Sequence, residues 1–534
     1  MKTTKVRTLR IYYDTVRYLK FRQLFFGVFY RLKKPFLKTS FKKAAQNKVD
    51  FFHLNLNPSI HQRQSFSQHK FSFLNLSKSF DGDIDWNYLG YGKLWSYNLN
   101  YFDYLNQKVI DLHEATSILE SFCSEPDERK EGNEPYPISL RGINWIKFFS
   151  SRNVSNSRYN QLLFAHYKYL SSNLEYHLLG NHLLENGFSL LFGAYYFQND
   201  NFYKKATTIL ISELEEQILD DGGHFELSPM YHQILLFRLL DVINVVKNNS
   251  WKNQEHLAFF NKKAQAMLGW LNEITFSNGE VPMVNDSAYN IGPSSLALMD
   301  YANRLGILPS KRPLSSSGYR MIQAHRMELF VDVGNIGADY IPGHAHSDTL
   351  NFILYADQKP IVVDTATSTY ERDGFRQFER STQSHNTVAI NNVNQSEVWA
   401  SFRVGRRARI TDLEESENYI KAAHNGYKSL GLKHTRHWRW ENDKILIVDE
   451  VSGTRQVKET MAYFHFHPNV DPLLEGTIVN AGGIRFKWTG SSQIRIQDYD
   501  FAAGFNNRVK SKVAIVKFID HLETRITFLS DPSI

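Results

Sequence analysis

The chain has 534 residues, 42% of them hydrophobic and 14% aromatic, so it can bury large cores and is expected to form two to four domains. Its single cysteine excludes an intramolecular disulfide framework. The net charge of +7 is concentrated at the start, where residues 1–50 carry fourteen Lys or Arg against two Asp; the rest is slightly acidic, which argues against a nucleic-acid partner.

Residues 1–80 are predicted to form a basic N-terminal extension, and its most apolar run is Leu24–Tyr30. This run is short and lies between Arg22 and Arg31, unlike a secretion signal, and no stretch of the chain is long enough to span a bilayer. We therefore expect a protein that is cytoplasmic or peripheral at the membrane. Two interpretations of the basic, aromatic segment Tyr18–Lys34 stay open: it contacts an anionic membrane surface, or it is a solvated or packed terminal helix.

Residues 81–315 have the pattern of amphipathic helices. Apolar residues recur at spacings of three and four, as expected where one helix face packs against a core. The segments that show this pattern are Leu162–Leu174, Leu183–Phe197, Ala206–Ile218, Ile234–Val246 and Leu257–Leu271.

Helix starts are predicted near Ser139, at Asn181, at Ser228 and near Asn285-Asp286. The intervals between them are 42, 47 and 57 residues, each long enough for one helical hairpin. Helices that begin at these points should therefore run in the same direction. This is the organisation of an (α/α) toroid, in which the inner helices start at one rim and their aligned dipoles favour an anionic ligand.

Residues 316–534 consist of short β-rich runs separated by turn residues such as Asn442-Asp443 and Gly482-Gly483. Helices followed by strands indicate two domains and not a parallel α/β fold. The predicted fold class is multidomain α+β, with an N-terminal (α/α) toroid of helical hairpins followed by a C-terminal antiparallel β-sandwich. The predicted strands are Glu328–Val333, Leu350–Tyr355, Pro360–Val363, Thr387–Ile390, Arg407–Ile410, Tyr419–Ala423, Lys444–Val448, Ala462–His467, Ile494–Ile496, Val513–Phe518 and Thr524–Phe528.

Two polar clusters lie in the helical part. In the first, His182 and Glu185 follow Asn181 and fall on one helix face; the alternative is a capping Asn with a solvated His and Glu. The second, Asp221–His232, surrounds a double-glycine turn and the helix start at Ser228. Tyr231 falls in the first turn of that helix, where we expect the helix dipole to lower its pKa; the alternative is a ring packed on the neighbouring helix.

A third cluster, Gly343–Asp348, lies in strand-like sequence. In an extended chain His344 and His346 point the same way, as two metal ligands or a ligand and a base would. With Asp364 and His385, His346 forms a nitrogen and oxygen donor set that favours zinc.

Six segments between residues 85 and 470 carry a family resemblance: Lys93–Phe102, Tyr136–Arg141, Gly180–Glu185, Asp221–His232, Pro342–Asp348 and Arg380–Val388. Across these segments the chain resembles the heparinase II/III-like polysaccharide lyases. The resemblance implies the same toroid and sandwich, and lytic cleavage of a uronic-acid-containing anionic polysaccharide by β-elimination: removal of the C5 proton and expulsion of the 4-O substituent.

Motif matching implies a role for each candidate residue. Asn181 would bind the uronate carboxylate, supported by His182 and Glu185. Tyr231 would protonate the leaving oxygen and His344 would be the base; for the opposite C5 stereochemistry Tyr231 would make both proton transfers.

The resemblance also implies one structural zinc ion, held by His346, Asp364 and His385, and no organic cofactor. The zinc would fix the strand that delivers His344 to the toroid. Further candidates for substrate contact are Arg141, His224, Glu226 and Arg380.

Three other functions stay open. A uronate C5-epimerase would use the same base and acid, and a non-catalytic glycan-binding or assembly protein could keep the fold. A toroidal glycoside hydrolase would need two opposed carboxylates, for which Asp221 and Glu226 are available. The biological setting that we expect is a capsule or exopolysaccharide pathway; the sequence leaves the oligomeric state unknown.

Overall fold

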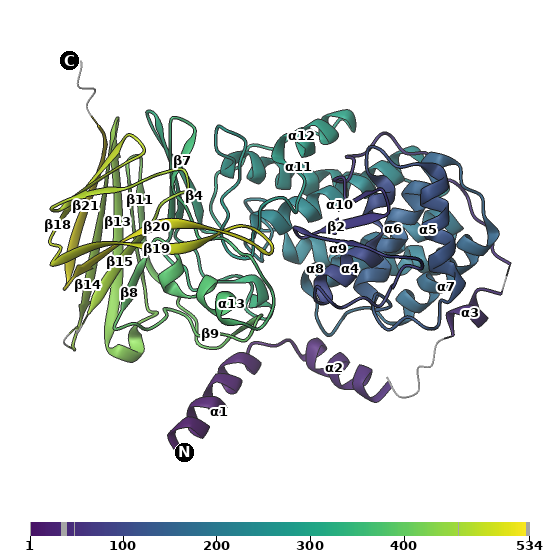
Figure 1. Cartoon of the computed structure of the whole chain (residues 1–534), viewed down its shortest axis with the longest axis horizontal. Helices are drawn as coiled ribbons and strands as arrows, with labels where there is room; N and C mark the ends of the chain where they lie inside the picture. Colours follow the sequence, from purple (N-terminus) through teal and green to yellow (C-terminus); the bar gives the residue numbers. More distant parts are fainter. Residues whose placement is uncertain (1, 34–39, 47, 456, 458, 530–534) are drawn as a thin grey trace.

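The chain folds into a helical half and a sheet half that lie side by side (Figure 1). This computed structural model describes residues 2–33, 40–46, 48–455, 457 and 459–529. Apart from a small sheet at residues 66–79 and short helices in the second half, the helices precede the sheets along the chain, and every pairing between the named strands is antiparallel. The predicted multidomain α+β fold class is therefore confirmed.

The helices of the toroid alternate between two positions. The first residues of one set line a large cavity, and these inner helices are α4 (Lys93–Tyr101), α6 (Pro135–Arg152), α8 (Gly180–Phe197), α10 (Pro229–Asn248) and α12 (Ser295–Arg304). The helices between them do not reach that cavity: α5 (Leu112–Ser124), α7 (Ser157–Ser172), α9 (Asp200–Gln217) and α11 (Leu257–Ile274). The inner helices thus begin at one rim, as the spacing of the predicted helix starts requires.

One predicted helix start is confirmed in detail. Ser228 caps α10, its hydroxyl accepting a hydrogen bond from the backbone N–H of Tyr231 at 3.5 Å, and Pro229 occupies the first helical position.

The other three predicted starts are wrong in position. Ser139 lies inside α6, which begins four residues earlier at Pro135. Asn181 lies in the first turn of α8, where its side chain bonds Glu226 and does not cap the helix. No helix begins at Asn285, whose φ of 53° is left-handed; α12 begins at Ser295. In each case a tertiary contact or the backbone conformation overrode a local capping signal.

The sheet half contains a sandwich around one core that includes Phe352, Trp438, Phe464 and Trp488. Its largest sheet has the order β11-β12-β13-β14-β21-β18-β17-β16, and two further sheets have the orders β19-β20-β15-β8 and β4-β5-β6-β7. The strands are β4 (Tyr319–Ala324), β5 (Met327–Asp332), β6 (Phe352–Ala356), β7 (Lys359–Val362), β8 (Val388–Ile390), β11 (Ile410–Ser416), β12 (Tyr419–His424), β13 (Leu432–Glu441), β14 (Lys444–Gly453), β15 (Thr460–His465), β16 (Leu473–Glu475), β17 (Ile478–Ala481), β18 (Ile484–Thr489), β19 (Gln493–Gly504), β20 (Asn507–Phe518) and β21 (His521–Phe528).

Most predicted strands are present, but the one expected at Arg407–Ile410 is displaced. It begins at Ile410, because the backbone N–H groups of Ala408 and Arg409 donate to the side chains of Ser396 and Asn425, each at 2.9 Å, and not to a neighbouring strand.

Two hairpin tips close one end of the cleft between the halves. The long β19–β20 hairpin reaches from the sandwich toward the helices (Figure 1). Beside it lies the small sheet of β1 (Phe66–Ser67), β2 (Lys70–Phe73) and β3 (Leu76–Ser79). Asn75 donates to the Phe505 carbonyl at 2.8 Å, and Asn506 donates to the Leu74 carbonyl at 3.0 Å.

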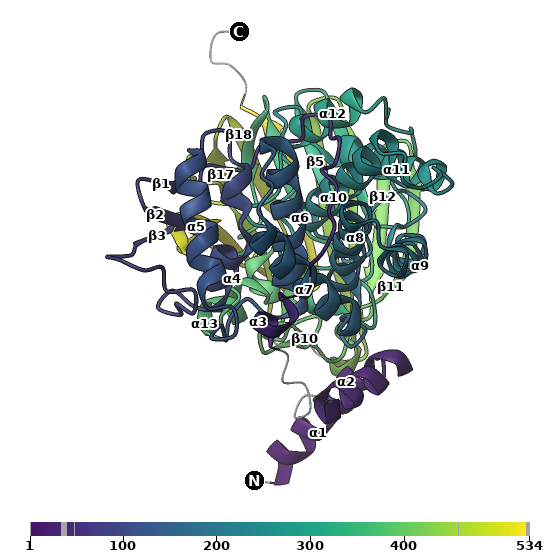
Figure 2. The ribbon, with the colours of Figure 1, turned by 90° about the vertical axis from the view of Figure 1, so that its right-hand side faces the viewer.

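The two N-terminal helices, α1 (Lys2–Val16) and α2 (Phe21–Lys33), lie outside both halves and run along the edge of the molecule (Figures 1 and 2). After them, α3 (Phe41–Ala44) packs on α7. None of the described helices is long and apolar enough to cross a membrane. Lys34, the last residue of the segment considered for membrane contact, lies outside the described residues.

Candidate active site

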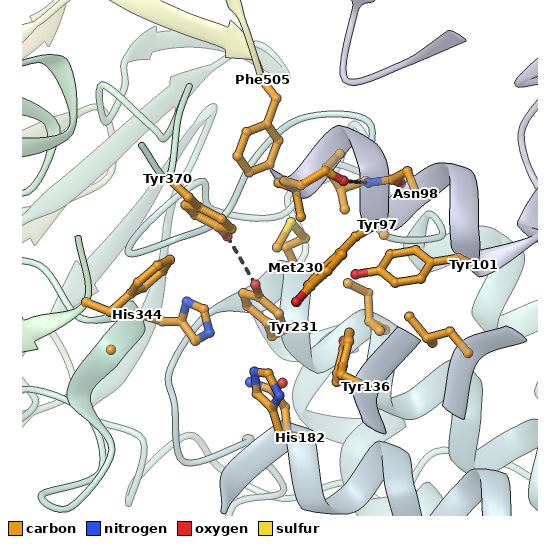
Figure 3. Close-up of a pocket in the computed structure, with 18 of the residues that line it drawn as sticks. Tyr97, Asn98, Tyr101, Tyr136, His182, Met230, Tyr231, His344, Tyr370 and Phe505 are labelled. Atoms are coloured by element: carbon orange, nitrogen blue, oxygen red, sulfur yellow. Dashed lines mark hydrogen bonds between the residues drawn. The ribbon is translucent and has the colours of Figure 1, made fainter. Parts of the chain in front are cut away.

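A cavity of about 1480 Å³ lies between the rim of the toroid and the sandwich. The first turns of the inner helices form its floor. The sandwich contributes the loop at His344, the segment around Tyr370 and the hairpin tip at Phe505 (Figure 3). Residues from α1 and α2 complete one wall. A cleft of this size, open to both halves, can hold several sugar units of a chain.

Tyr231 and His344 meet in this cavity although they come from different halves. Their ring centroids are 4.1 Å apart. The Tyr231 hydroxyl also shares a hydrogen bond of 3.1 Å with the hydroxyl of Tyr370 (Figure 3). A phenol and an imidazole at this distance can reach the same sugar ring.

Burial raises the pKa of Tyr231 above its ordinary value, although its hydrogen bond with Tyr370 acts in the opposite direction. The expectation that the α10 dipole lowers this pKa is therefore wrong, because desolvation of the phenolate outweighs the dipole. Tyr231 stays protonated at neutral pH. It is suited to donate a proton and less suited to accept one.

Asp286 joins the two histidines of the Gly343–Asp348 cluster. Its carboxylate contacts Nδ1 of His344 at 2.8 Å and Nε2 of His346 at 2.9 Å. It also accepts from both terminal nitrogens of the Arg376 guanidinium, one of them at 2.7 Å. The Asp286 side chain is completely buried.

Burial alone would raise the pKa of Asp286, but Arg376 and the two histidine hydrogen bonds hold that pKa well below its usual range. The carboxylate is therefore ionised and accepts N–H from Nδ1 of His344. This bond fixes the imidazole tautomer that leaves Nε2 free to accept a proton. Nε2 of His344 lies 3.5 Å from the carboxylate of Glu226, which also accepts a hydrogen bond from the Asn181 amide.

The first turn of α8 presents Asn181 and His182 to the cavity. The amide of Asn181 is held by Glu226, to whose oxygens its Nδ2 donates at 3.0 and 3.1 Å. His182 packs on the ring of Tyr136, with centroids 4.6 Å apart, and its Nδ1 contacts Glu175 at 3.2 Å. An amide donor and an imidazole therefore lie side by side on the floor.

The charge state of this floor follows from its carboxylates. Burial opposes the charged form of His182, but the carboxylates of Glu175, Glu226 and Glu185 together outweigh burial and raise the pKa of His182. Glu185 lies one turn deeper and is buried; desolvation raises its pKa to about 6 although the Arg238 guanidinium, 3.4 Å away, acts against this. Arg238 lines the cavity whereas Glu185 does not. Glu185 therefore positions Arg238.

Four of the predicted substrate contacts are buried and lie outside the lining of the cavity: Arg141, His224, Glu226 and Arg380. Arg141 donates to the backbone carbonyls of Asn100 and Gly132. Arg380 donates to the carbonyl of Ala345, at 3.2 and 2.9 Å, and so holds the residue between the two histidines.

The other two support the floor from below. His224 contacts Gln217 at 3.0 Å, and burial lowers the pKa of this histidine well below its usual value. Glu226 fixes the amide of Asn181. The geometry therefore gives all four residues structural contacts within the protein.

The three predicted zinc ligands are buried behind the cavity. The rings of His346 and His385 have centroids 5.3 Å apart, and Nδ1 of His385 contacts Asp364 at 2.8 Å. Nδ1 of His346 and Nε2 of His385 are buried without a hydrogen-bond partner, as is Oδ2 of Asp348.

Histidines that bind a metal usually have their other ring nitrogen held by a carboxylate, and both of these rings meet that condition. The carboxylate of Asp364 is already used by His385 and by Asn351, which donates at 2.7 Å. Within the described ranges no group of three His, Cys, Asp or Glu side chains is arranged to hold a metal.

Sequence reasoning missed Asp286, Tyr370, Arg376 and Arg238 as members of the site. Asp286 was noticed only as a helix start, and Arg376 lies in the short helix α13 (Gly374–Glu379) without any motif. The one signal available in the sequence was the polar pair Asn285-Asp286 between apolar helical segments. Their partners lie far away in sequence, so spacing could not have identified them.

Two sequence models of one family match the chain in succession. The model described as "Heparinase II/III N-terminus" matches residues 138–314, and the one described as "Heparinase II/III-like, C-terminal" matches residues 307–528.

A curated relative, the heparin-sulfate lyase of Bacteroides stercoris, is 23% identical over 320 residues. The match covers 54% of this chain and 46% of that relative, so the chain spans about half of the relative's length.

Two solved structures have a similar fold. A crystal structure of heparinase III has a TM-score of 0.68 at 16% identity and covers 85% of this chain and 81% of its own. A crystal structure of heparan sulfate lyase HepC from Pedobacter heparinus has a TM-score of 0.57 at 16% identity, covering 91% of this chain and 86% of its own.

Proposed function

Since the chain belongs to the heparinase II/III-like family, we propose that it is a polysaccharide lyase that cleaves a uronic-acid-containing anionic polysaccharide by β-elimination. The observation that carries this proposal is the meeting of Tyr231 and His344 in one cavity, with ring centroids 4.1 Å apart. Tyr231 is held protonated by burial, and His344, whose Nδ1 is bound by Asp286, offers Nε2 as the proton acceptor, 3.5 Å from the Glu226 carboxylate. β-Elimination needs both.

The proposed reaction begins with the uronate carboxylate on the floor of the cavity. Asn181 donates an amide hydrogen to it, and His182, whose pKa is raised by Glu175, supplies positive charge. Arg238 lies on the same floor. These donors would stabilise the negative charge that moves onto the carboxylate when the C5 proton leaves.

His344 then removes the C5 proton through Nε2, and the electron pair forms the C4–C5 double bond. The C4–O4 bond breaks, and Tyr231 donates its proton to O4. The products are an unsaturated uronate and a chain end with a free hydroxyl. The proton on His344 can return to the Tyr231 phenolate, because the two rings are in contact.

We also propose that His346, Asp364 and His385 hold a structural zinc ion. The buried, unpaired ring nitrogens of His346 and His385 support this. When bound, the ion would contribute rigidity to the loop that carries His344 and take no part in proton transfer. Asp364 would have to turn from His385 toward the ion.

The test is to incubate the protein with a panel of uronate polysaccharides and to follow the ultraviolet absorbance of the unsaturated product. A lyase produces this absorbance and shorter chains. The C5-epimerase alternative instead predicts exchange of the C5 hydrogen in heavy water without new absorbance. A non-catalytic glycan-binding protein gives neither signal but retains affinity for one polymer of the panel.

A glycoside hydrolase is not favoured by the positions of its two candidate carboxylates. Asp221 accepts hydrogen bonds from the backbone of Ser315 and Ser317, at 3.0 and 2.9 Å, and so ties two loops together. Glu226 is held under Asn181. Neither side chain lines the cavity, so the opposed pair that hydrolysis requires is not formed there.

Asp286 acts through His344, so we expect Asp286→Asn to lower lyase activity about a hundredfold. The amide no longer holds the imidazole in the tautomer that has its proton on Nδ1. The sandwich offers a matched control. Asp449 accepts from Arg436 at 2.7 and 3.0 Å and from His434 at 2.8 Å, far from the cavity. The control variant is Asp449→Asn. Asp286→Asn and Asp449→Asn should each lower the free energy of unfolding by about 3–5 kcal/mol, since each leaves a buried guanidinium unpaired.

Urea unfolding and initial rates at saturating substrate would test this prediction. Equal loss of stability with loss of activity in Asp286→Asn alone would support the positioning role. Loss of activity in both variants to the same degree would mean that stability, not the tautomer of His344, limits the rate.

Removal of zinc should lower the stability of the sandwich more than it lowers the rate of the reaction. We expect a purified sample to contain about one zinc per chain by elemental analysis. Exhaustive chelation should lower the unfolding temperature, and His385→Ala should abolish both the zinc and the response to the chelator. A sample without zinc that unfolds at the same temperature before and after chelation would refute the metal site.

The setting of this activity in a capsule or exopolysaccharide pathway, and its location in the cytoplasm or at the membrane, stay predictions. Glycosaminoglycan is the substrate class that the names of the similar proteins suggest for the panel.

A further inference from the structure

Helix α2 turns a continuous apolar stripe to the solvent. Its outward residues repeat at spacings of three and four along the helix, and each is between 43% and 80% exposed. Such a stripe is normally the face that a helix buries. It consists of Phe21, Leu24, Phe25, Val28, Phe29 and Leu32.

Helix α1 carries further exposed apolar residues, of which the half-exposed Tyr12 has its ring against Trp399, with centroids 5.2 Å apart. Its exposed apolar residues, Leu9, Tyr12, Tyr13 and Val16, have the same spacing. Together the two helices carry ten of the twenty-eight large hydrophobic residues that are exposed in the described part of the chain. We call these ten residues the outer stripe. Scattered exposed apolar residues are ordinary, but a stripe over two adjacent helices marks a contact surface.

The opposite face of α2 is attached to the protein, so the outer stripe is not a face that has failed to pack. Phe26 lies on the ring of Tyr176, with centroids 4.8 Å apart, and the Tyr30 hydroxyl donates to the carbonyl of Leu174 at 2.5 Å. Gln23 donates at 3.3 Å to carbonyls on both sides of the cleft, those of Leu178 and Tyr340. These contacts fix which side of the helix faces outward.

The charge around the outer stripe is positive. Residues 9–33 contain six Lys or Arg and one acid, Asp14. Arg10 and Arg17 pair with Asp14, Lys20 with Glu216 and Arg22 with Glu213. Arg31, beside Leu32 at the end of the stripe, is exposed, also lines the cavity, and has no ion-pair partner among the described residues. Apolar and aromatic side chains bordered by cations are the composition of helices that lie in the surface of an anionic bilayer.

We propose that α1 and α2 dock this protein on an anionic membrane, with the outer stripe inserted at the level of the lipid headgroups. The helices would lie in the surface and not cross it. With 13 residues α2 is about 20 Å long, against about 30 Å for a hydrocarbon core. A second copy of the chain is less suited as the occupant, because two such positively charged surfaces would repel each other.

The same two helices have their inner side on the cavity, where Thr15, Leu19, Gln23, Gly27 and Tyr30 form part of its wall. A membrane bound to the outer stripe would therefore lie directly behind one wall of the cavity, on the side where α1 and α2 run past both halves (Figure 1). If the proposed lyase function holds, the substrate is a polymer that is present at this membrane surface.

The test is sedimentation of the full chain with vesicles of phosphatidylcholine, with and without phosphatidylglycerol. We expect binding to the anionic vesicles, weaker binding in high salt, and at least about a tenfold lower partition coefficient for Phe25→Glu/Phe29→Glu. The matched control is Leu473→Glu/Leu474→Glu, which places the same charges on exposed apolar residues of β16 and should bind like the wild type.

Several results would overturn the proposal. These are no binding to vesicles of either kind, equal binding to neutral and anionic vesicles, and equal losses in the two double variants. A wild-type dimer in light scattering that Phe25→Glu/Phe29→Glu converts to monomers would assign the outer stripe to a second copy. Neither pair of residues lines the cavity. Vesicle binding can therefore fail while lyase activity is present, and lyase activity can fail while binding is present.

Discussion

Tyr231→Phe is expected to lower the turnover number about 10³-fold with little change in KM. The substitution removes only the hydroxyl that would protonate the leaving oxygen, and general acid catalysis contributes about 10²–10⁴-fold. The ring, which packs beside His344, is retained. The measurement is the initial rate of unsaturated-uronate formation over a range of substrate concentrations.

Two controls separate this effect from damage to the cavity. Tyr101→Phe removes a hydroxyl that lines the same cavity from α4 and should keep most of the activity. Tyr370→Phe removes the hydrogen bond that Tyr231 makes at 3.1 Å, and a smaller loss is expected because the donor itself remains. If Tyr101→Phe and Tyr231→Phe are equally impaired, Tyr231 is not the acid.

His344→Ala is expected to have the second large effect, a loss of about 10²–10⁴-fold in the turnover number. Without the imidazole of His344, the proposed reaction lacks the base that accepts the C5 proton, and Tyr231 remains only as the acid. The double variant should be hardly slower than the worse single variant, because the two groups act in one step. His177→Ala, which removes another histidine of the cavity wall, is the control and should remain active.

The outcome for His344 also decides between the two proton-transfer schemes. A chain in which His344→Ala stays active while Tyr231→Phe is inactive would assign both transfers to Tyr231, as expected for the opposite C5 stereochemistry. Burial raises the pKa of Tyr231, which makes the phenol a poor base and favours the scheme with His344.

The sequence by itself predicted the order of the two halves and the common rim of the inner helices. Both depend on periodicity and on the spacing of helix starts, which are local properties of the chain. It also drew attention to Tyr231 and His344, since each lies in a polar cluster, and the resemblance to a known family gave them the roles of acid and base, which stay predictions. Ser228-Pro229 was enough to place the first turn of α10 and therefore Tyr231 at the rim.

The sequence could not place the groups that control these residues. Asp286 lies 58 positions before His344 and 90 before Arg376, and no short-range pattern joins them. Arg141 and Arg380 have the chemistry of carboxylate binding, but the fold surrounds them with backbone carbonyls. A side chain's chemistry is visible in the sequence, whereas its partners depend on which distant segments the fold brings together.

The amphipathic pattern of α2 was visible in the sequence as an apolar run between arginines, but its direction was not. Two faces of this helix are apolar, and only the contacts of Phe26 and Tyr30 with the toroid decide which one faces outward. The protonation state of Tyr231 also depends on the fold, because burial raises its pKa and outweighs the local helix dipole. The sequence thus proposed candidate residues for the chemistry, and the tertiary structure determined their charge states and orientations, because desolvation and long-range contacts exist only in the folded chain.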